Sequence, residues 1–159
     1  MTARARALVC AGAWGAVLLA AGCGNEEEER VKRSLAAMVE AVEAGDADAL
    51  MDYVAPDYTD QAGHDQRTAV KRVMTEVEQY QPLKVTLAHL DIDLEEKSGL
   101  AWVRFVPEYA GEKDPDRKTR PKYDFQPGQR LRLKLRKDGD RYEVLRAEMG
   151  MSFSGALGD

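Results

Sequence analysis

Residues 129–144 read QRLRLKLRKDGDRYEV, the pattern of an alternating strand, a tight turn and a returning strand. Side chains alternate between the two faces of a strand, so the leucines would share one face and the basic residues the other. Asp138-Gly139 is typical of a two-residue hairpin turn. The segment therefore predicts an antiparallel hairpin with one buried face.

Two further strands are predicted before this hairpin, at Leu83–Leu94 and Leu100–Tyr109, and the last strand should run from Arg141 to about Phe153. The apolar residues of the earliest strand change from one face to the other part-way along. A bulge or sharp bend near His89 would return them to a common face. The chain is thus expected to form a curved antiparallel sheet of about four strands.

Three helices are predicted ahead of the strands. The first, Asn25–Ala44, carries apolar residues at helical spacing. Asp46 can cap a short second helix that Pro56 ends, and Asp65 can cap a third that runs to about Tyr80. The polar segment between the second and third helices is expected to be rich in turns. Helices followed by strands define the α+β class.

The amino terminus has the pattern of a secretory signal peptide. Arg4 and Arg6 precede the uncharged stretch Leu8–Ala21. This stretch is shorter than the roughly 20 apolar residues that a membrane-spanning helix needs. Small residues then lead directly into Cys23, as expected before a cleavage site.

Residues 19–23, Leu-Ala-Ala-Gly-Cys, resemble a lipobox, the processing site of bacterial lipoproteins. The resemblance implies that residues 1–22 are removed and that Cys23 is acylated, which anchors the chain to a membrane. Gly24 after the cysteine implies sorting to the outer membrane, facing the periplasm. Residues 23–25 would then be a short tether.

The composition excludes several classes of function. The chain has 28 Asp and Glu residues against 23 Lys and Arg, a net charge of −5, which disfavours nucleic acid as a partner. Of the two cysteines, Cys10 is lost with the signal and Cys23 is used by the lipid, so no disulfide or thiolate chemistry is expected. No nucleophile elbow, phosphate-binding glycine loop or CxxC pair is present.

Three short segments resemble the nuclear transport factor 2-like superfamily in their order and spacing. They are AGDADALM at residues 44–51, APDYTD at residues 55–60 and DGDRYEV at residues 138–144. The resemblance makes residues 26–153 one domain, followed by a tail at residues 154–159. It implies a cone-shaped fold in which three helices pack on a curved sheet and an apolar cavity remains at one end.

The superfamily contains enzymes and non-enzymes, so the fold does not supply the function. Its ketosteroid isomerases use an Asp shortly before the third helix and a Tyr on the first, but here Ala62 and Met38 fall near those places. Asp60 is two places early, which counts against isomerase chemistry. Polyketide cyclases and scytalone-type dehydratases of this fold use Asp and His in the cavity. The comparable residues of this chain are His64, His89 and Asp91.

These two histidines are the candidate catalytic residues. His64 follows Asp60 at a loop-to-helix junction and could form an acid–base pair with it, or be a solvated loop residue. His89 and Asp91 share one face of a strand, so they could act as base and orienting group if that face is concave. Two histidines without a third nearby ligand fall short of a metal site, and no metal or cofactor is expected.

Two other groups of side chains are candidates for binding. A basic ridge on the strand of the predicted hairpin could meet an anionic surface, or be a solvent face balanced by acids such as Glu143. It consists of Arg130, Arg132, Lys134 and Arg136. Several aromatic residues could line a ligand pocket or belong to the core. They are Tyr53, Tyr58, Trp102, Phe105 and Tyr142.

Three hypotheses for the function follow. The first is a non-catalytic lipoprotein whose cavity binds a small apolar ligand or whose open sheet face binds a protein partner, including a second copy of the chain. The second is an enzyme of the cyclase or dehydratase type that uses His64 or His89 with a nearby Asp. The third is an envelope scaffold that docks through the basic ridge. A histidine pointing into a closed cavity beside a carboxylate would favour the second.

Overall fold

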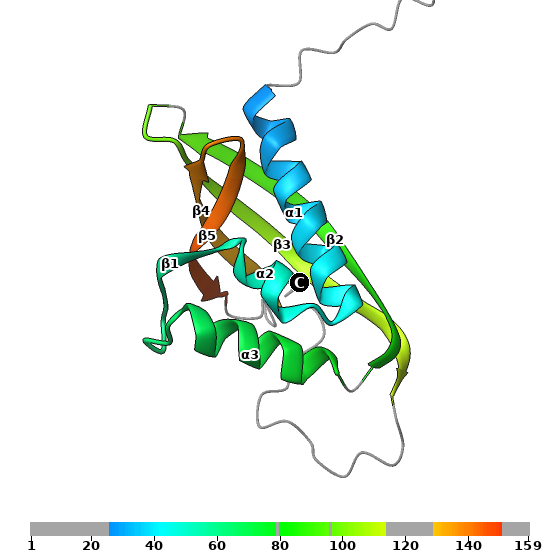
Figure 1. Ribbon diagram of the computed structural model, residues 1–159. Coiled ribbons are helices and arrows are strands. Elements are labelled where there is room, and N and C mark those ends of the chain that lie inside the picture. The colour runs from blue at the N-terminus through cyan, green and yellow to red at the C-terminus, as the bar shows by residue number, and fades with distance from the viewer. Residues whose placement is uncertain (1–25, 79, 96, 114–128, 151–159) are drawn as a thin grey trace, which may run out of the picture.

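The computed structural model describes residues 26–78, 80–95, 97–113 and 129–150. They form the helices α1 (Glu26–Ala44), α2 (Ala47–Met51) and α3 (Gln66–Val77), and the strands β1 (Val54–Asp60), β2 (Tyr80–Glu95), β3 (Leu100–Lys113), β4 (Leu131–Asp138) and β5 (Arg141–Met149). The helices cover one face of a curved sheet (Figure 1). The predicted α+β architecture is confirmed, while the signal peptide, Cys23 and the tail lie outside the described residues.

The sheet has five strands in the order β1-β5-β4-β3-β2, one more than the sequence predicted. The additional strand is β1, where the end of the second helix and a turn-rich segment were expected, and it pairs with β5 in parallel. Pro56 is compatible with this position because β1 lies at the edge of the sheet. The four predicted strands pair antiparallel as expected, and the parallel edge comes from β1, which the sequence did not predict as a strand.

The bulge predicted near His89 is present. The register of β2 against β3 shifts between Ala88 and Asp91, and His89 has a φ of 54°. Leu87 before the bulge and Ile92 after it both pack against the core. The extra residue thus corrects the phase of the apolar pattern, and Leu90 is left on the surface.

The helices begin where the sequence places their caps. Asp46 accepts a hydrogen bond from the Ala49 N–H, and Asp65 accepts one from the Thr68 N–H. Helix α3 ends at Val77, earlier than predicted, because Tyr80 already belongs to β2. None of the described helices is long and apolar enough to span a membrane.

The core lies between the helices and the concave face of the sheet. Its most completely buried large side chains are Val31 of α1, Val103 of β3 and Leu135 of β4. The first turn of α1 is fixed to the β4–β5 hairpin through Glu27, which accepts hydrogen bonds from Lys137 Nζ at 2.7 Å and from the Tyr142 hydroxyl at 3.0 Å. The opposite end of the sheet is the end at which a cavity forms.

Candidate functional site

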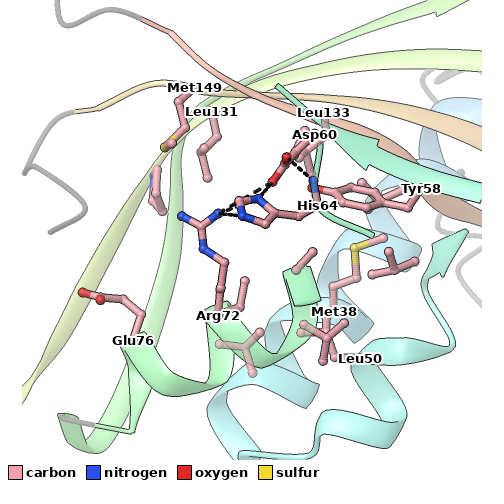
Figure 2. A pocket seen from close by; sticks show the side chains of 18 of the residues that line it. Met38, Leu50, Tyr58, Asp60, His64, Arg72, Glu76, Leu131, Leu133 and Met149 are labelled. Carbon is pink, nitrogen blue, oxygen red and sulfur yellow. Dashed lines mark hydrogen bonds and ion pairs between the residues drawn. The ribbon is translucent and has the colours of Figure 1, made fainter. Parts of the chain in front are cut away.

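A cavity of about 810 Å³ lies between the helices and the sheet. Its walls are mainly apolar side chains from α1, α2, α3 and all five strands of the sheet, and Figure 2 shows how they surround the space. They include Met38, Leu50, Val73, Leu87, Leu131, Leu133 and Met149. A space of this size and lining is typical of a site for a small organic ligand.

One side of the cavity carries a polar trio composed of Asp60, His64 and Arg72 (Figure 2). Asp60 ends β1, His64 follows in the connecting turn, and Arg72 lies on α3. Asp60 Oδ1 accepts the backbone N–H groups of Ala62 and His64, both at 2.9 Å. These two bonds fix the turn, so the His64 ring is held at the cavity wall by its own backbone as well as by its side chain.

The imidazole of His64 lies between a carboxylate and a guanidinium. Its Nδ1 is 2.7 Å from Asp60 Oδ2, and Arg72 Nη1 is 2.8 Å from Nδ1 and 3.3 Å from Nε2. An ionised carboxylate only accepts hydrogen bonds, so it favours the tautomer with the proton on Nδ1. In this tautomer Nε2 can accept a hydrogen bond from Arg72 Nη1 at 3.3 Å, whereas the shorter contact of Nη1 with Nδ1 joins two donors.

The electrostatic state of Asp60 follows from these contacts. Burial raises the pKa of its carboxyl, but the hydrogen bonds from His64 and Ala62 outweigh burial and bring the pKa below the ordinary value of 3.8. Neighbouring Tyr58 also lines the cavity, and burial, with a smaller contribution from Asp60, raises its pKa to about 12. Near neutral pH the wall therefore presents an ionised carboxylate beside an uncharged phenol.

A second acidic side chain lies further along α3. Glu76 is buried and lines the cavity, and Figure 2 shows its carboxylate on the far side of Arg72 from His64 and Asp60. Burial and then Glu76 raise the pKa of Tyr109 to about 12. Tyr109 also lines the cavity and stacks on Tyr80, with 5.9 Å between ring centroids. Glu76 and Tyr109 thus belong to the part of the cavity wall next to the trio along α3.

The other predicted histidine site lies elsewhere. His89 and Asp91 are exposed, and with Arg104 and Arg130 they border a smaller hollow of about 270 Å³. Asp91 is paired with Arg104 on the neighbouring strand, at 2.5 Å, and not with His89 among the interactions of the described residues. The structure therefore brings His64, and not His89, to the large cavity.

Two of the five aromatic candidates line the large cavity, Tyr58 and Phe105. The other three do not, so the pocket prediction was wrong for them. Tyr142 is buried and bonded to α1, while Trp102 lies under Arg132, whose guanidinium carbon is 3.8 Å from the ring centroid. Tyr53 packs against the core and lies under Arg141. These three aromatic side chains therefore have a structural role, because they pack against the core or against neighbouring surface side chains.

The basic ridge is largely neutralised by neighbouring acids. Arg136 binds Glu143 on β5 at 2.7 Å and Asp57 on β1 at 2.8 Å. Arg132 is 3.8 Å from Glu148, and both Arg132 and Lys134 lie over Trp102. Arg130 borders the smaller hollow. An arrangement of this kind is that of a solvated strand face and gives little support to docking on an anionic surface.

The sequence did not single out Arg72 or Glu76. Both lie on α3 close to its apolar face, at positions 72 and 76 among Ala69, Val73 and Val77. Charged residues that interrupt an apolar helical stripe are the signal that could have found them. Among the described residues, no group of three or more His, Cys, Asp or Glu could bind a metal ion.

No protein-family model and no curated protein sequence matches the chain. Solved structures do resemble it. One is a candidate scytalone dehydratase from Novosphingobium aromaticivorans, with a TM-score of 0.59, 16% identity, and coverage of 77% of this chain and 82% of that one. Another is a candidate aromatic ring hydroxylase from the same organism, with a TM-score of 0.58, 15% identity, and coverage of 80% and 90%.

A third similar structure is a candidate dehydratase of the nuclear transport factor 2-like family from Streptomyces avermitilis. Its TM-score is 0.53 at 12% identity, and the match covers 76% of this chain and 92% of that one. At such identities the resemblance establishes the fold alone. The chain therefore has the nuclear transport factor 2-like fold, also described as cystatin-like, and this prediction from the sequence is confirmed.

Proposed function

We propose that this protein is a lipid-anchored protein of the bacterial envelope whose cavity binds a small apolar molecule. The observation that carries the ligand-binding part is the cavity of about 810 Å³, whose lining is mainly apolar and has one polar trio. Proteins of this fold form such spaces by wrapping a sheet around helices, and the space is large enough for a molecule of several rings.

The anchor rests on residues 19–23 and on the position of the domain. Helix α1 begins at Glu26, three residues after Cys23, so an acyl chain on the cysteine would keep the domain close to the bilayer. Metabolic labelling with an alkyne-bearing fatty acid tests this proposal. Wild-type protein should be labelled and sediment with membranes, whereas a Cys23→Ser variant should lose both properties. An unlabelled wild-type chain that keeps residues 1–22 would contradict the proposal.

Ligand binding can be tested with the neutral fluorophore N-phenyl-1-naphthylamine and the full chain carrying Cys23→Ser, which has no acyl chain of its own. Binding should enhance the fluorescence. Leu133→Trp, which fills the cavity, should reduce binding at least about tenfold. The matched control is Lys134→Trp, on the next residue of β4, which lies over Trp102 on the other face. Equal binding by both variants would contradict a cavity site.

A second candidate function is acid–base catalysis, and the position of His64 favours it. The ring lines the cavity with Asp60 Oδ2 2.7 Å from Nδ1, which is the geometry of a base oriented by a carboxylate. In a dehydratase or cyclase reaction, Nε2 would take a proton from a carbon next to a carbonyl. The resulting enolate oxygen would be stabilised by a positive group such as Arg72.

Deuterium exchange at the α-carbon of 2-tetralone, followed by NMR, tests this candidate without knowledge of the natural substrate. The wild-type chain should accelerate exchange, and His64→Gln should abolish the acceleration. His89→Gln should have no effect, because His89 is exposed and borders only the smaller hollow. If the wild-type rate equals that of buffer, this proton abstraction is excluded and the binding function is unaffected.

A further inference from the structure

The hydrogen bonds of the trio determine which kind of group it can offer to a ligand. Both oxygens of Asp60 are already acceptors, Oδ1 for two backbone N–H groups and Oδ2 for the imidazole. The carboxylate is therefore committed to the turn and to His64. What faces the cavity from this side is the Arg72 guanidinium, which only donates, and the outer edge of the His64 ring.

From this we infer that the ligand of the cavity is an amphipathic acid, an apolar body with one carboxylate that binds Arg72. The inference rests on the ligand-binding function proposed above and specifies its ligand class. A carboxylate matches the planar fork of a guanidinium and forms charge-assisted hydrogen bonds, which are stronger than those of a neutral hydroxyl. The partly buried position of Arg72, with 27% of its side chain exposed, increases this difference.

The charges around the trio are consistent with such a ligand. Arg72 Nη1 is 3.8 Å from Asp60 Oδ2, beyond hydrogen-bonding distance, and lies closer to the imidazole. The Asp60 charge is already stabilised by three N–H donors, so it does not depend on Arg72. The apolar body would then extend toward Met38, Leu50 and Leu133 (Figure 2).

A matched pair of fluorescent ligands tests the inference, namely 2-naphthoate and 2-naphthalenemethanol, which share one apolar body. The full chain with Cys23→Ser is titrated with each at neutral pH. This protein, with its cavity side chains unchanged, should bind 2-naphthoate at least about tenfold more tightly than 2-naphthalenemethanol. Arg72→Gln should remove this preference by weakening the binding of 2-naphthoate, and urea denaturation of the variant shows whether it is folded.

Two control variants test whether Arg72, and not another cation of α3, causes the preference for the carboxylate. Arg67→Gln makes the same substitution at an exposed position of α3 outside the cavity lining and should keep the preference. Lys71→Gln removes an exposed cation that borders the cavity and should also keep it. Loss of the preference in Lys71→Gln but not in Arg72→Gln would overturn the assignment to Arg72.

Different results would contradict the acidic ligand class and the ligand-binding function. Equal affinity of the wild-type cavity for both ligands would overturn the inference and leave apolar ligand binding intact. Binding of neither naphthalene compound, together with no binding of N-phenyl-1-naphthylamine, would overturn the proposed function as well.

Discussion

The two histidines of the chain look alike in sequence and differ completely in structure. Each has an aspartate within a few residues, Asp60 before His64 and Asp91 after His89. His64 lines the cavity and is bonded to its aspartate, whereas His89 is an exposed residue at a bulge and Asp91 binds Arg104. Nearness in sequence thus does not create a His–Asp pair. The pair forms where a turn bends the chain back on itself beside a cavity.

The largest difference between the two regions should appear on removal of the aspartates. Asp60→Ala leaves the N–H groups of Ala62 and His64 without their acceptor, so the free energy of unfolding should fall by about 2 kcal/mol. Asp91→Ala removes one exposed ion pair and should cost less than about 0.5 kcal/mol. Urea denaturation measures both. Equal losses would mean that the Asp60 turn contributes no more than a surface contact.

Acidification should reveal the same contrast. The pKa of Asp60 is lower in the fold than its ordinary value of 3.8, so ionised Asp60 stabilises the fold above that pH. This stabilisation is lost as the pH falls through the lowered pKa. Asp60→Ala should therefore lose less stability than wild type between neutral pH and about pH 3, as measured by urea denaturation at each pH. A parallel decline in both proteins would contradict the lowered pKa.

The loss of stability at low pH should be smaller in Asp60→Ala but still present, because other carboxyls contribute to it. Hydrogen bonds from basic residues, from the Thr68 side chain or from the backbone also lower the pKa of other partly or fully exposed carboxyls. They are Glu27, Glu43, Asp57 and Asp65. The contribution of Asp60 to stability is thus the difference between wild type and Asp60→Ala in how the free energy of unfolding changes with pH.

The bulge gives a smaller effect that is specific to His89. Its φ of 54° is a conformation that β-branched residues adopt only with strain, so His89→Val should lower the free energy of unfolding by about 1 kcal/mol. His89→Asn should be nearly neutral because Asn tolerates this conformation. Thermal unfolding of the two variants compares them. A neutral His89→Val would show that the bulge moves or relaxes at little cost.

The smallest effect is expected on the convex face. Arg104→Gln breaks the ion pair with Asp91, but both side chains are about half exposed, so stability should change by less than about 0.5 kcal/mol. Unfolding in low and high salt checks this, and the wild type and the variant should converge at high salt. A difference that persists in high salt would indicate that the smaller hollow is more than a solvated surface.

The sequence predicted the parts of the fold that local patterns determine. The caps at Asp46 and Asp65, the hairpin at Asp138-Gly139 and the bulge at His89 each follow from residue types at fixed spacing. Strand β1 was not predicted, because its residues look like a turn and extend only through pairing with β5. Long-range pairing of this kind has no local signal.

The candidate site was predicted in part. His64 and Asp60 were named together, as were Tyr58 and Phe105, and all four line the cavity. Arg72 was missed because it reaches His64 from α3, and a single arginine in a helix is normally a surface residue. The choice between the two histidines needed the curvature of the sheet, which the alternation of residues does not encode. Catalysis, lipidation and the ligand remain predictions with the tests given above.

The clasp formed by Glu27 with Lys137 and Tyr142 has a consequence for how the domain faces its surroundings. It joins the start of α1, and so the proposed lipid attachment, to the hairpin end of the sheet. Asp60 pairs with Ala147 and Leu131 with Met149, toward the opposite tip, about 20 Å along β4 at 3.3 Å per residue. A protein tethered in this way would stand on the bilayer with its polar trio uppermost, and would load its cargo from the aqueous space instead of from the leaflet beneath it.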